Sequence, residues 1–326
     1  EPPRPSVQKK APSRIALRNV AGAAAVFGAV LATSCELPEP LGMAPVPADY
    51  QQRFEAWHAD RVQALTHPTG WMRLAGLHWL QQGVQTFGSG PDADVRFPEG
   101  KLQPVAGSFR VRADSVWMTA GPSTELTLDG EPVRPGQEVL LFDPVTQDAP
   151  MVAGGSLEWL IIQREDLLGV RLYDHENPLA DAFEGFERFP MDSAWHLKAR
   201  LVPHSEPTQF AVTNVLGQTV MVDSPGILEF TTTTGESYSI LPMTEGEKMF
   251  IVFGDKTNGN ATYGSGRYLY VEFPPEGSDM TIIDFNLAYN PPCSYTAFST
   301  CQLPPPSNRL PIPVRAGERA PGPEYR

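Results

Sequence analysis

The chain has 326 residues with 41% hydrophobic content, enough to bury a sizeable core, so it does not belong with disordered proteins. Proline (34) and glycine (28) are both abundant, and this composition favours turns and short strands over long helices. The net charge of −13 argues against nucleic acid as a partner, because an acidic surface repels phosphate. We therefore expect a mainly β protein.

The first 34 residues have the three-part pattern of a secretory signal peptide. Basic residues as far as Arg18 precede the uncharged, mostly apolar run 20–32, and small residues then lead to Cys35. Thirteen residues are too few for a membrane-spanning helix, which needs about 20. The end of the run resembles a lipoprotein cleavage motif, although Ala32 stands where leucine is usual and Leu31 lies one place earlier. Ordinary signal cleavage, with Cys35 incidental, is the alternative.

A lipid on Cys35 would anchor the chain to a membrane of the cell envelope, on the periplasmic or outer-surface side. Residues 1–34 carry a net charge of +4, so their removal leaves −17 on the body. Residues 35–48 contain four prolines and predict a stiff tether between the lipid and the body.

The other two cysteines, Cys293 and Cys301, form an even pair if Cys35 carries lipid. A disulfide between them would close a short loop in a proline-rich segment and stabilise it by about 2.5 kcal/mol. Free thiols are the alternative.

Residues 49–175 have the pattern of a helix followed by short strands. Apolar residues at helical spacing predict an amphipathic helix over residues 50–65, with Asp49 as its cap. The apolar residues of 71–83 predict a second short helix or turn, and beyond Gly83 the period changes from about four residues to two. The predicted strands are 84–87, 108–112, 116–119, 125–128, 138–142, 157–163 and 169–173. Short strands at this spacing predict a β-sandwich or barrel.

Residues 176–319 predict a second β unit. Its predicted strands are 196–202, 209–215, 219–222, 226–231, 236–242, 249–253 and 267–273. The last two are almost continuously apolar, as buried strands are. Residues 284–326 are rich in proline and are expected to run as an extended tail over the surface. We expect residues 320–326 to be a disordered end.

Several polar, glycine-rich and proline-rich blocks resemble domain-of-unknown-function family 1684. These blocks are Gly70 to Leu74 with Gly76 to Leu80, Asp255 to Gly259 with Thr262 to Gly264 and Gly266 to Tyr268, and Asp284 to Cys293 continuing through Pro304 to Leu310. The resemblance covers roughly residues 50–319. It implies membership of a family with no known activity.

Part of the first β unit resembles a forkhead-associated β-sandwich. The matching residues are Phe87-Gly88-Ser89 with Asp94, Gly107-Ser108-Phe109, and Asp129-Gly130. Forkhead-associated domains hold phosphothreonine with an arginine after the first glycine, but this position carries Ser89. Asp129 in a later loop would repel a phosphate. We therefore expect a structural sandwich that does not bind phosphopeptides.

Standard catalytic motifs are absent from the sequence: there is no G-x-S-x-G elbow, H-E-x-x-H, C-x-x-C or P-loop. The six histidines are scattered without the spacing of metal ligands, so we expect no metal and no cofactor. Residues 255–259 lack the ligands of a calcium loop and predict a turn.

Polar residues gather in two segments of the second unit, and they would form one cleft if the tail folds across the ends of strands 249–253 and 267–273. The candidate ligand-binding residues are Asp255, Thr257, Tyr263, Arg267, Asp284, Asn286, Tyr289 and Asn290. The alternative is an internal network of ion pairs and hydrogen bonds that locks the tail down. Arg164, Arg171 and Asp174 are candidates for the same network.

Three functions remain open. The leading hypothesis is a membrane-anchored binding or accessory module of the cell envelope, whose cleft holds a small or polymeric ligand. The second is an envelope hydrolase that uses Asp255 or Asp284 as acid or base, with Arg267 stabilising an anion. The third is a structural lipoprotein without a ligand.

Overall fold

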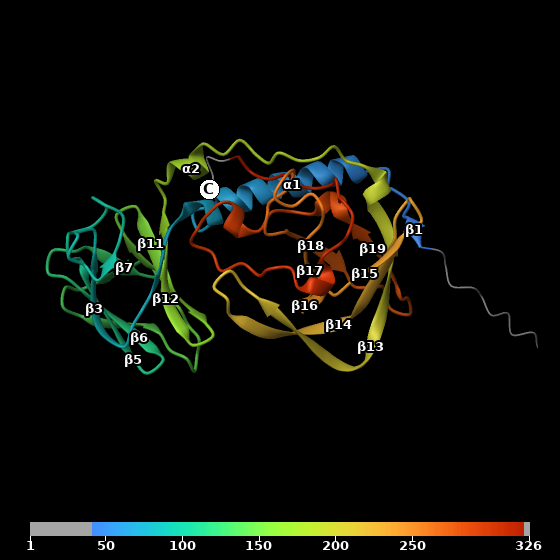
Figure 1. Cartoon of the computed structure of the whole chain (residues 1–326). Helices are drawn as coiled ribbons and strands as arrows, with labels where there is room; N and C mark the ends of the chain where they lie inside the picture. Colours follow the sequence, from blue (N-terminus) through green and yellow to red (C-terminus); the bar gives the residue numbers. More distant parts are fainter. Residues whose placement is uncertain (1–40, 323–326) are drawn as a thin grey trace, which may run out of the picture. The chain divides into compact units, whose positions relative to one another are not determined.

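The structure is a computed structural model and describes residues 41–322 (Figure 1). The predicted signal peptide, residues 35–40 of the predicted tether, which include Cys35, and the last four residues lie outside this part of the chain. The fold is mainly β, with one long helix near the start. Within residues 41–322, no helix is both long enough and apolar enough to cross a membrane.

The first β unit is a sandwich of two largely antiparallel sheets. One sheet has the order β2 (Leu74–Trp79), β12 (Leu167–Asp174), β11 (Leu157–Arg164), β10 (Val152–Gly154), β7 (Leu126–Leu128) and β8 (Glu131–Val133). The other has the order β4 (Val95–Arg96), β3 (Gly83–Gly88), β5 (Gly107–Arg112), β6 (Ser115–Ala120) and β9 (Glu138–Phe142). The seven strands predicted for this unit are therefore confirmed, with small shifts at their ends.

Aromatic rings from both sheets fill the core of the sandwich. The ring centroid of Phe87 lies 4.5 Å from that of Phe109 and 5.8 Å from that of Trp159. All three side chains are completely buried. The alternation of these residues with exposed ones made the strands predictable, because one face of each strand meets the core and the other does not.

The second β unit contains two further sheets. One has the order β1 (Gly42–Met43), β13 (His196–Thr213), β14 (Thr219–Thr231) and β15 (Ser237–Ile240), and β19 (Met280–Asp284) also pairs with β13. The other consists of β16 (Met243–Glu245), β17 (Lys248–Phe253) and β18 (Arg267–Glu272). Phe285 packs between them, with its ring 5.4 Å from Phe230 and 5.5 Å from Phe253.

Two predictions about individual elements are wrong. Residues 71–83 do not form a helix: the 3-10 turn η1 (Trp71–Arg73) leads into strand β2, which pairs with β12. Cross-strand pairing thus overrides a spacing that fits a helix. The four short strands predicted between residues 196 and 231 are two long strands, β13 and β14, with a register shift between Pro203 and Thr208.

Helix α1 (Tyr50–Thr66) confirms the predicted helix, but Asp49 makes no capping hydrogen bond with its side chain. Several side chains of α1 contact the second β unit and the segment before it. Glu55 pairs with Arg188 at 2.6 Å, and Arg61 pairs with Glu318 at 2.7 Å. The only other α-helix among the described residues is the single turn α2 (Pro178–Asp181).

The proline-rich tail is extended, as predicted, but it is buried where a surface path was expected. It contains the 3-10 turns η3 (Phe285–Leu287), η4 (Pro292–Ser294) and η5 (Pro306–Asn308). Val314 and Ala316 are completely buried, and Leu310 is almost so. Gly317 has φ of +75°, and a β-carbon there would overlap the carbonyl of Ala288, so only glycine fits this close approach.

Candidate functional site

Three of the eight candidate residues form a buried network that holds the tail. Nη2 of Arg267 lies 2.8 Å from Oδ2 of Asp255, and both side chains have no exposed area. Arg267 also donates to the carbonyls of Val314 at 2.8 Å and of Ala316. Oδ1 of Asp255 accepts from the backbone N–H of Thr257 at 2.7 Å. This network matches the alternative prediction, an internal set of ion pairs and hydrogen bonds that locks the tail down. No ligand can reach it without displacing the tail.

Asp284 and Asn286 belong to a second network, which ties helix α1 to the second β unit. Asp284 accepts a hydrogen bond from the hydroxyl of Tyr50, and its Oδ1 accepts from the backbone N–H of Asn286 at 3.1 Å. Nδ1 of His196 lies 3.2 Å from Oδ2 of Asp284. The side chain of Asn286 donates to the carbonyl of Asp192 at 2.9 Å. Burial is the main cause of a raised pKa at Tyr50, so its hydroxyl stays protonated.

Asn290 belongs to a third network around Glu318, a residue that the sequence analysis missed. Glu318 is completely buried, and its carboxylate accepts from Nε of Arg61 at 2.7 Å and from the backbone N–H of Asn290 at 2.7 Å. Burial raises the pKa of Glu318, and the charge of Arg61 opposes this rise. The guanidinium of Arg61 lies 4.3 Å above the ring of Tyr289. The sequence did carry a signal for this pair, because Arg61 lies on the apolar face of the predicted helix. A buried arginine needs an acidic partner, which here is Glu318.

The hydroxyl of Tyr263 donates to the carbonyl of Cys293 at 3.0 Å. Cys293 is one of the two cysteines of the predicted disulfide, and Cys301 is the other. Both cysteines are free thiols in the structure. The backbone N–H of Cys293 donates to Sγ of Cys301 at 3.0 Å, and Oγ of Ser299 donates to Sγ of Cys293 at 3.0 Å. Hydrogen bonds from Cys301 and Ser299 lower the pKa of Cys293 to about 6, despite its burial. The two cysteines are therefore neighbours without a bridge.

An open cleft lies beside these networks. Two cavities of about 490 and 310 Å³ adjoin each other, and we call them together the Trp71 cleft. They share the lining residues Trp71, Glu245, Phe250, Tyr268 and Pro292. Of the eight candidates, Tyr289 and Asn290 line this cleft. The first unit contributes Trp71 and Arg164, whereas Tyr268 and Glu245 come from the second.

Neutral aromatic rings form one wall of the Trp71 cleft. The rings of Tyr270 and Tyr289 stack at 6.2 Å, and Tyr268 meets Tyr289 edge-on at 5.8 Å. Burial raises the pKa of Tyr268 and of Tyr289, and it raises that of Tyr270 to about 12. The wall therefore offers ring faces and protonated hydroxyls near neutral pH, as sites for flat ligands do.

Two arginines place positive charge at the other side of the cleft. Arg164 lines it, and its Nε donates to Oγ1 of Thr300 at 3.2 Å. Arg171 lies 5.0 Å from the ring of Trp71, and its Nε and Nη2 are buried without a hydrogen-bond partner among the described residues. Burial lowers the pKa of Arg171, and the charge of Arg164 adds to this effect. Arg164 therefore borders the cleft, Arg171 contacts its lining residue Trp71, and neither joins the Asp255 network.

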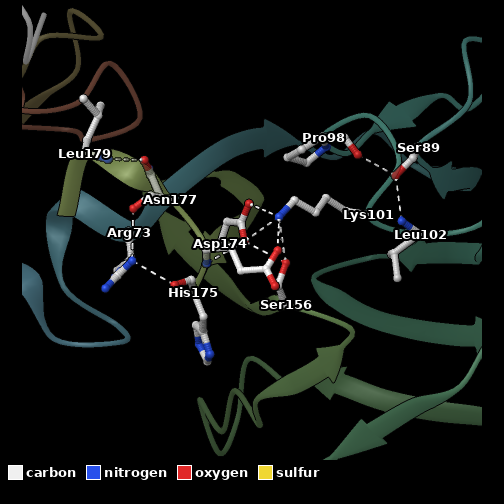
Figure 2. A network of polar contacts seen from close by, with 11 residues as sticks. Arg73, Ser89, Pro98, Lys101, Leu102, Ser156, Asp174, His175, Asn177 and Leu179 are labelled. Atoms are coloured by element: carbon white, nitrogen blue, oxygen red, sulfur yellow. Dashed lines mark hydrogen bonds and ion pairs between the residues drawn. The ribbon is translucent and has the colours of Figure 1, made fainter. Parts of the chain in front are cut away.

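Asp174, the third residue expected near them, takes part in a different contact inside the first unit (Figure 2). Its carboxylate lies 3.1 Å from Nζ of Lys101, which also pairs with Glu176 at 2.7 Å. Figure 2 also shows Ser89, which donates to the carbonyl of Pro98 at 2.6 Å. Ser89 stands where forkhead-associated domains carry their phosphate-binding arginine, and here it stabilises its own loop. Among residues 41–322, no three His, Cys, Asp or Glu side chains gather as metal ligands would.

The substitution Asp255→Asn separates a structural role of the Arg267 network from a binding role. Asparagine keeps the shape but removes the charge opposite a fully buried guanidinium, so we expect the free energy of unfolding to fall by about 3–5 kcal/mol. Urea denaturation followed by tryptophan fluorescence measures this loss. Glu272→Gln is the control, because the pair of Glu272 with Lys248 is exposed and its loss costs at most about 1 kcal/mol. Equal stability of the two variants would show that the Arg267 pair does not lock the tail.

Comparisons with known proteins agree with the sequence blocks quoted above from residue 255 onwards, whereas the block at residues 70–80 lies outside the matched region. The family described as "Protein of unknown function (DUF1684)" matches residues 181–319. The chain is 33% identical to an uncharacterized protein from gene locus rrnAC0354 of Haloarcula marismortui, whose solution structure it matches over 44% of this chain and 80% of that chain with a TM-score of 0.37.

Other solved structures are more distant. The FHA1 domain of yeast Rad53 is 14% identical over 36% of this chain and 66% of that domain, with a TM-score of 0.20. The N-terminal FHA domain of S. cerevisiae Rad53p in complex with a phosphothreonine peptide is 13% identical over 31% of this chain and 73% of that chain, with a TM-score of 0.18. Likenesses this weak support no inference about binding. No curated protein matches the sequence. The chain belongs to the DUF1684 family.

Proposed function

We propose that this protein is a ligand-binding module of the cell envelope, and that its site is the Trp71 cleft. Its ligand carries an anionic group, which binds near Arg164 and Arg171, and a flat apolar part, which packs against Tyr268. The observation that carries the proposal is the pair of Arg164, which lines the cleft, and Arg171, which contacts the lining residue Trp71 and has two buried nitrogens without a hydrogen-bond partner among residues 41–322.

The charge of the cleft supports an anionic ligand. A buried donor without an acceptor costs about 1–3 kcal/mol, and more when it is charged. Burial is the main cause of the lowered pKa of Arg171, and repulsion by Arg164 adds to it. An anion between them would relieve both costs, in a protein whose overall charge is strongly negative. Glu245 lines the same cleft and would turn the anionic end of a ligand towards the arginines.

The two rival functions have less support. A hydrolase that uses Asp255 with Arg267 would need catalytic groups that meet substrate, but both side chains have no exposed area. Asp284 does line a cavity, but its carboxylate already accepts hydrogen bonds from Tyr50 and Asn286, which makes it a poor catalytic acid or base. A structural lipoprotein has no use for an open cleft that is lined by an arginine and aromatic rings.

The substitution Arg164→Gln tests the proposed site with anilinonaphthalene sulfonate, a fluorescent probe that combines an anionic group with flat rings. Loss of a charge-assisted hydrogen bond costs about 1.5–3 kcal/mol, so we expect the dissociation constant of the probe to rise at least about tenfold. Fluorescence titration of the full chain measures it, and a thermal melt confirms that the variant is folded.

Arg110→Gln is the matched control for this titration. Arg110 lies on the sandwich, pairs with Glu138 and is 45% exposed, so its loss removes the same charge away from the cleft. We expect this variant to bind the probe like the unmodified chain. If both variants bind equally well, the probe does not use the cleft arginines and the proposed site is wrong.

The anchor on Cys35 belongs to the same proposal, and it rests on the sequence because residues 1–40 lie outside the described part of the chain. We expect cells that express the chain to attach an alkyne-bearing palmitate to it. Cys35→Ala should abolish the label, whereas Cys293→Ala should keep it, since only Cys35 follows the apolar run. Detection is by in-gel fluorescence after coupling a dye. Label that persists in Cys35→Ala would exclude this anchor.

A reversible Cys293–Cys301 disulfide is part of the proposal as well. The thiolate of Cys293 attacks oxidised glutathione and releases one glutathione. Cys301 then attacks the mixed disulfide, loses its proton to solvent and releases the second glutathione. Because the pKa of Cys293 is lowered to about 6, the thiolate is present above that pH, and the rate should rise through about pH 6.

Intact-mass spectrometry over a pH series follows this oxidation. The unmodified chain should lose two hydrogens in mass, and Cys301→Ala should stop at the mixed disulfide with glutathione. A rate that rises only near pH 9, or a chain that keeps glutathione bound with both cysteines present, would contradict the pairing.

A further inference from the structure

A further cavity, distinct from the Trp71 cleft of the proposed function, lies between helix α1 and strands β17 to β19. Its volume is about 420 Å³, which is within the range of sites for small molecules. Its walls are mostly apolar, with Phe54 and Trp57 from α1 and Ile282 and Leu287 from the opposite side. We call it the α1 pocket.

One wall of the α1 pocket carries a buried histidine beside a carboxylate. His196 is 5% exposed and Asp284 is 7% exposed, and both line the pocket. Nδ1 of His196 lies 3.2 Å from Oδ2 of Asp284. Asp284 also accepts from Tyr50 and from the backbone and side chain of Asn286, all of which donate hydrogen. Asp284 therefore acts as an acceptor in each of these contacts.

The carboxylate decides which nitrogen of His196 carries the hydrogen. A lone pair on Nδ1 would be repelled by an oxygen 3.2 Å away, so Nδ1 carries the hydrogen, and in the neutral ring Nε2 is an acceptor. Neither ring nitrogen makes a hydrogen bond among residues 41–322: Nδ1 has only the 3.2 Å contact with Asp284, and Nε2 has no polar neighbour in hydrogen-bonding geometry. An unsatisfied buried acceptor destabilises the folded chain, and a donor from a ligand would recover that loss.

The charges at the rim of the α1 pocket are largely balanced. Lys248 pairs with Glu272 at 2.7 Å, and Arg53 adds one positive charge. The interior offers apolar walls, the Asp284 carboxylate that already accepts from Tyr50 and Asn286, and the unsatisfied Nε2 of His196, so it matches neither an ion nor a sugar with many hydroxyls. We infer that the α1 pocket is a second binding site, for a small apolar molecule that carries one hydroxyl group and donates it to Nε2 of His196.

Fluorine NMR of the full chain with para-fluorobenzyl alcohol tests this inference, and para-fluorotoluene serves as the matched probe without the hydroxyl. We expect the alcohol to bind at least about tenfold more tightly, because the hydrocarbon leaves Nε2 without a donor. His196→Phe keeps the ring but removes the acceptor, so it should abolish the preference for the alcohol. His196→Gln supplies a side-chain carbonyl and should restore part of it.

Ile282→Trp provides a second, independent variant, since Ile282 lines the pocket and is 42% exposed, which leaves room for a larger side chain. It should block both probes while the thermal melt stays unchanged. Equal affinities for alcohol and hydrocarbon, a preference that survives His196→Phe, or binding that survives Ile282→Trp would each overturn the inference. The Arg164→Gln variant should bind both probes normally. The experiments therefore distinguish a failure of the α1 pocket inference from a failure of the Trp71 cleft proposal.

Discussion

The buried ion pair between Arg267 and Asp255 holds the C-terminal tail in place, and the remaining long-range contacts depend on it. Arg267 binds the tail at the carbonyl of Val314, and four residues later Glu318 meets Arg61 of helix α1. A buried charge is tolerated only while its partner and its hydrogen bonds are kept. Release of the tail would therefore expose two charged groups and remove the anchor of α1 at the same time.

This dependence explains which parts of the fold could be predicted from the sequence. Strands β5 and β11 were predictable because alternation records which face is buried, and residues such as Phe109 and Trp159 are indeed in the core. Strand β2 was mistaken for a short helix or turn, since Leu74, Leu77 and Leu80 recur at helical spacing, and the pairing with β12 overrides that spacing. Proline content correctly excluded a sheet in the tail. It carries no information about burial, which is set by contacts with residues about 50 positions away.

The candidate site was predictable in its residue types but not in its grouping. Asp255 and Arg267 were recognised as a possible pair, and the structure places them together inside the protein. The Trp71 cleft escaped detection because it joins Arg164 of the first β unit to Tyr268 of the second, which are far apart in the chain. Its trace in the sequence is two arginines on paired strands that are otherwise mostly apolar: Arg164 at the end of β11 and Arg171 in the middle of β12. A charge at such a position requires a partner.

Helix α1 contributes to both cavities, which links the two sites to the stability of the same element. Arg61 lines the Trp71 cleft, Trp57 lines the α1 pocket, and Tyr270 borders both. A ligand that binds only the folded arrangement stabilises it by mass action, whichever cavity it occupies. Because the ion pair of Arg61 with Glu318 already holds α1 against the tail, occupancy of either cavity would reinforce contacts that the Arg267 network has positioned. The Arg267 network and the two cavities thus have complementary roles. The network holds the walls of the cavities in place, and the cavities contain unsatisfied polar groups that a ligand can bind.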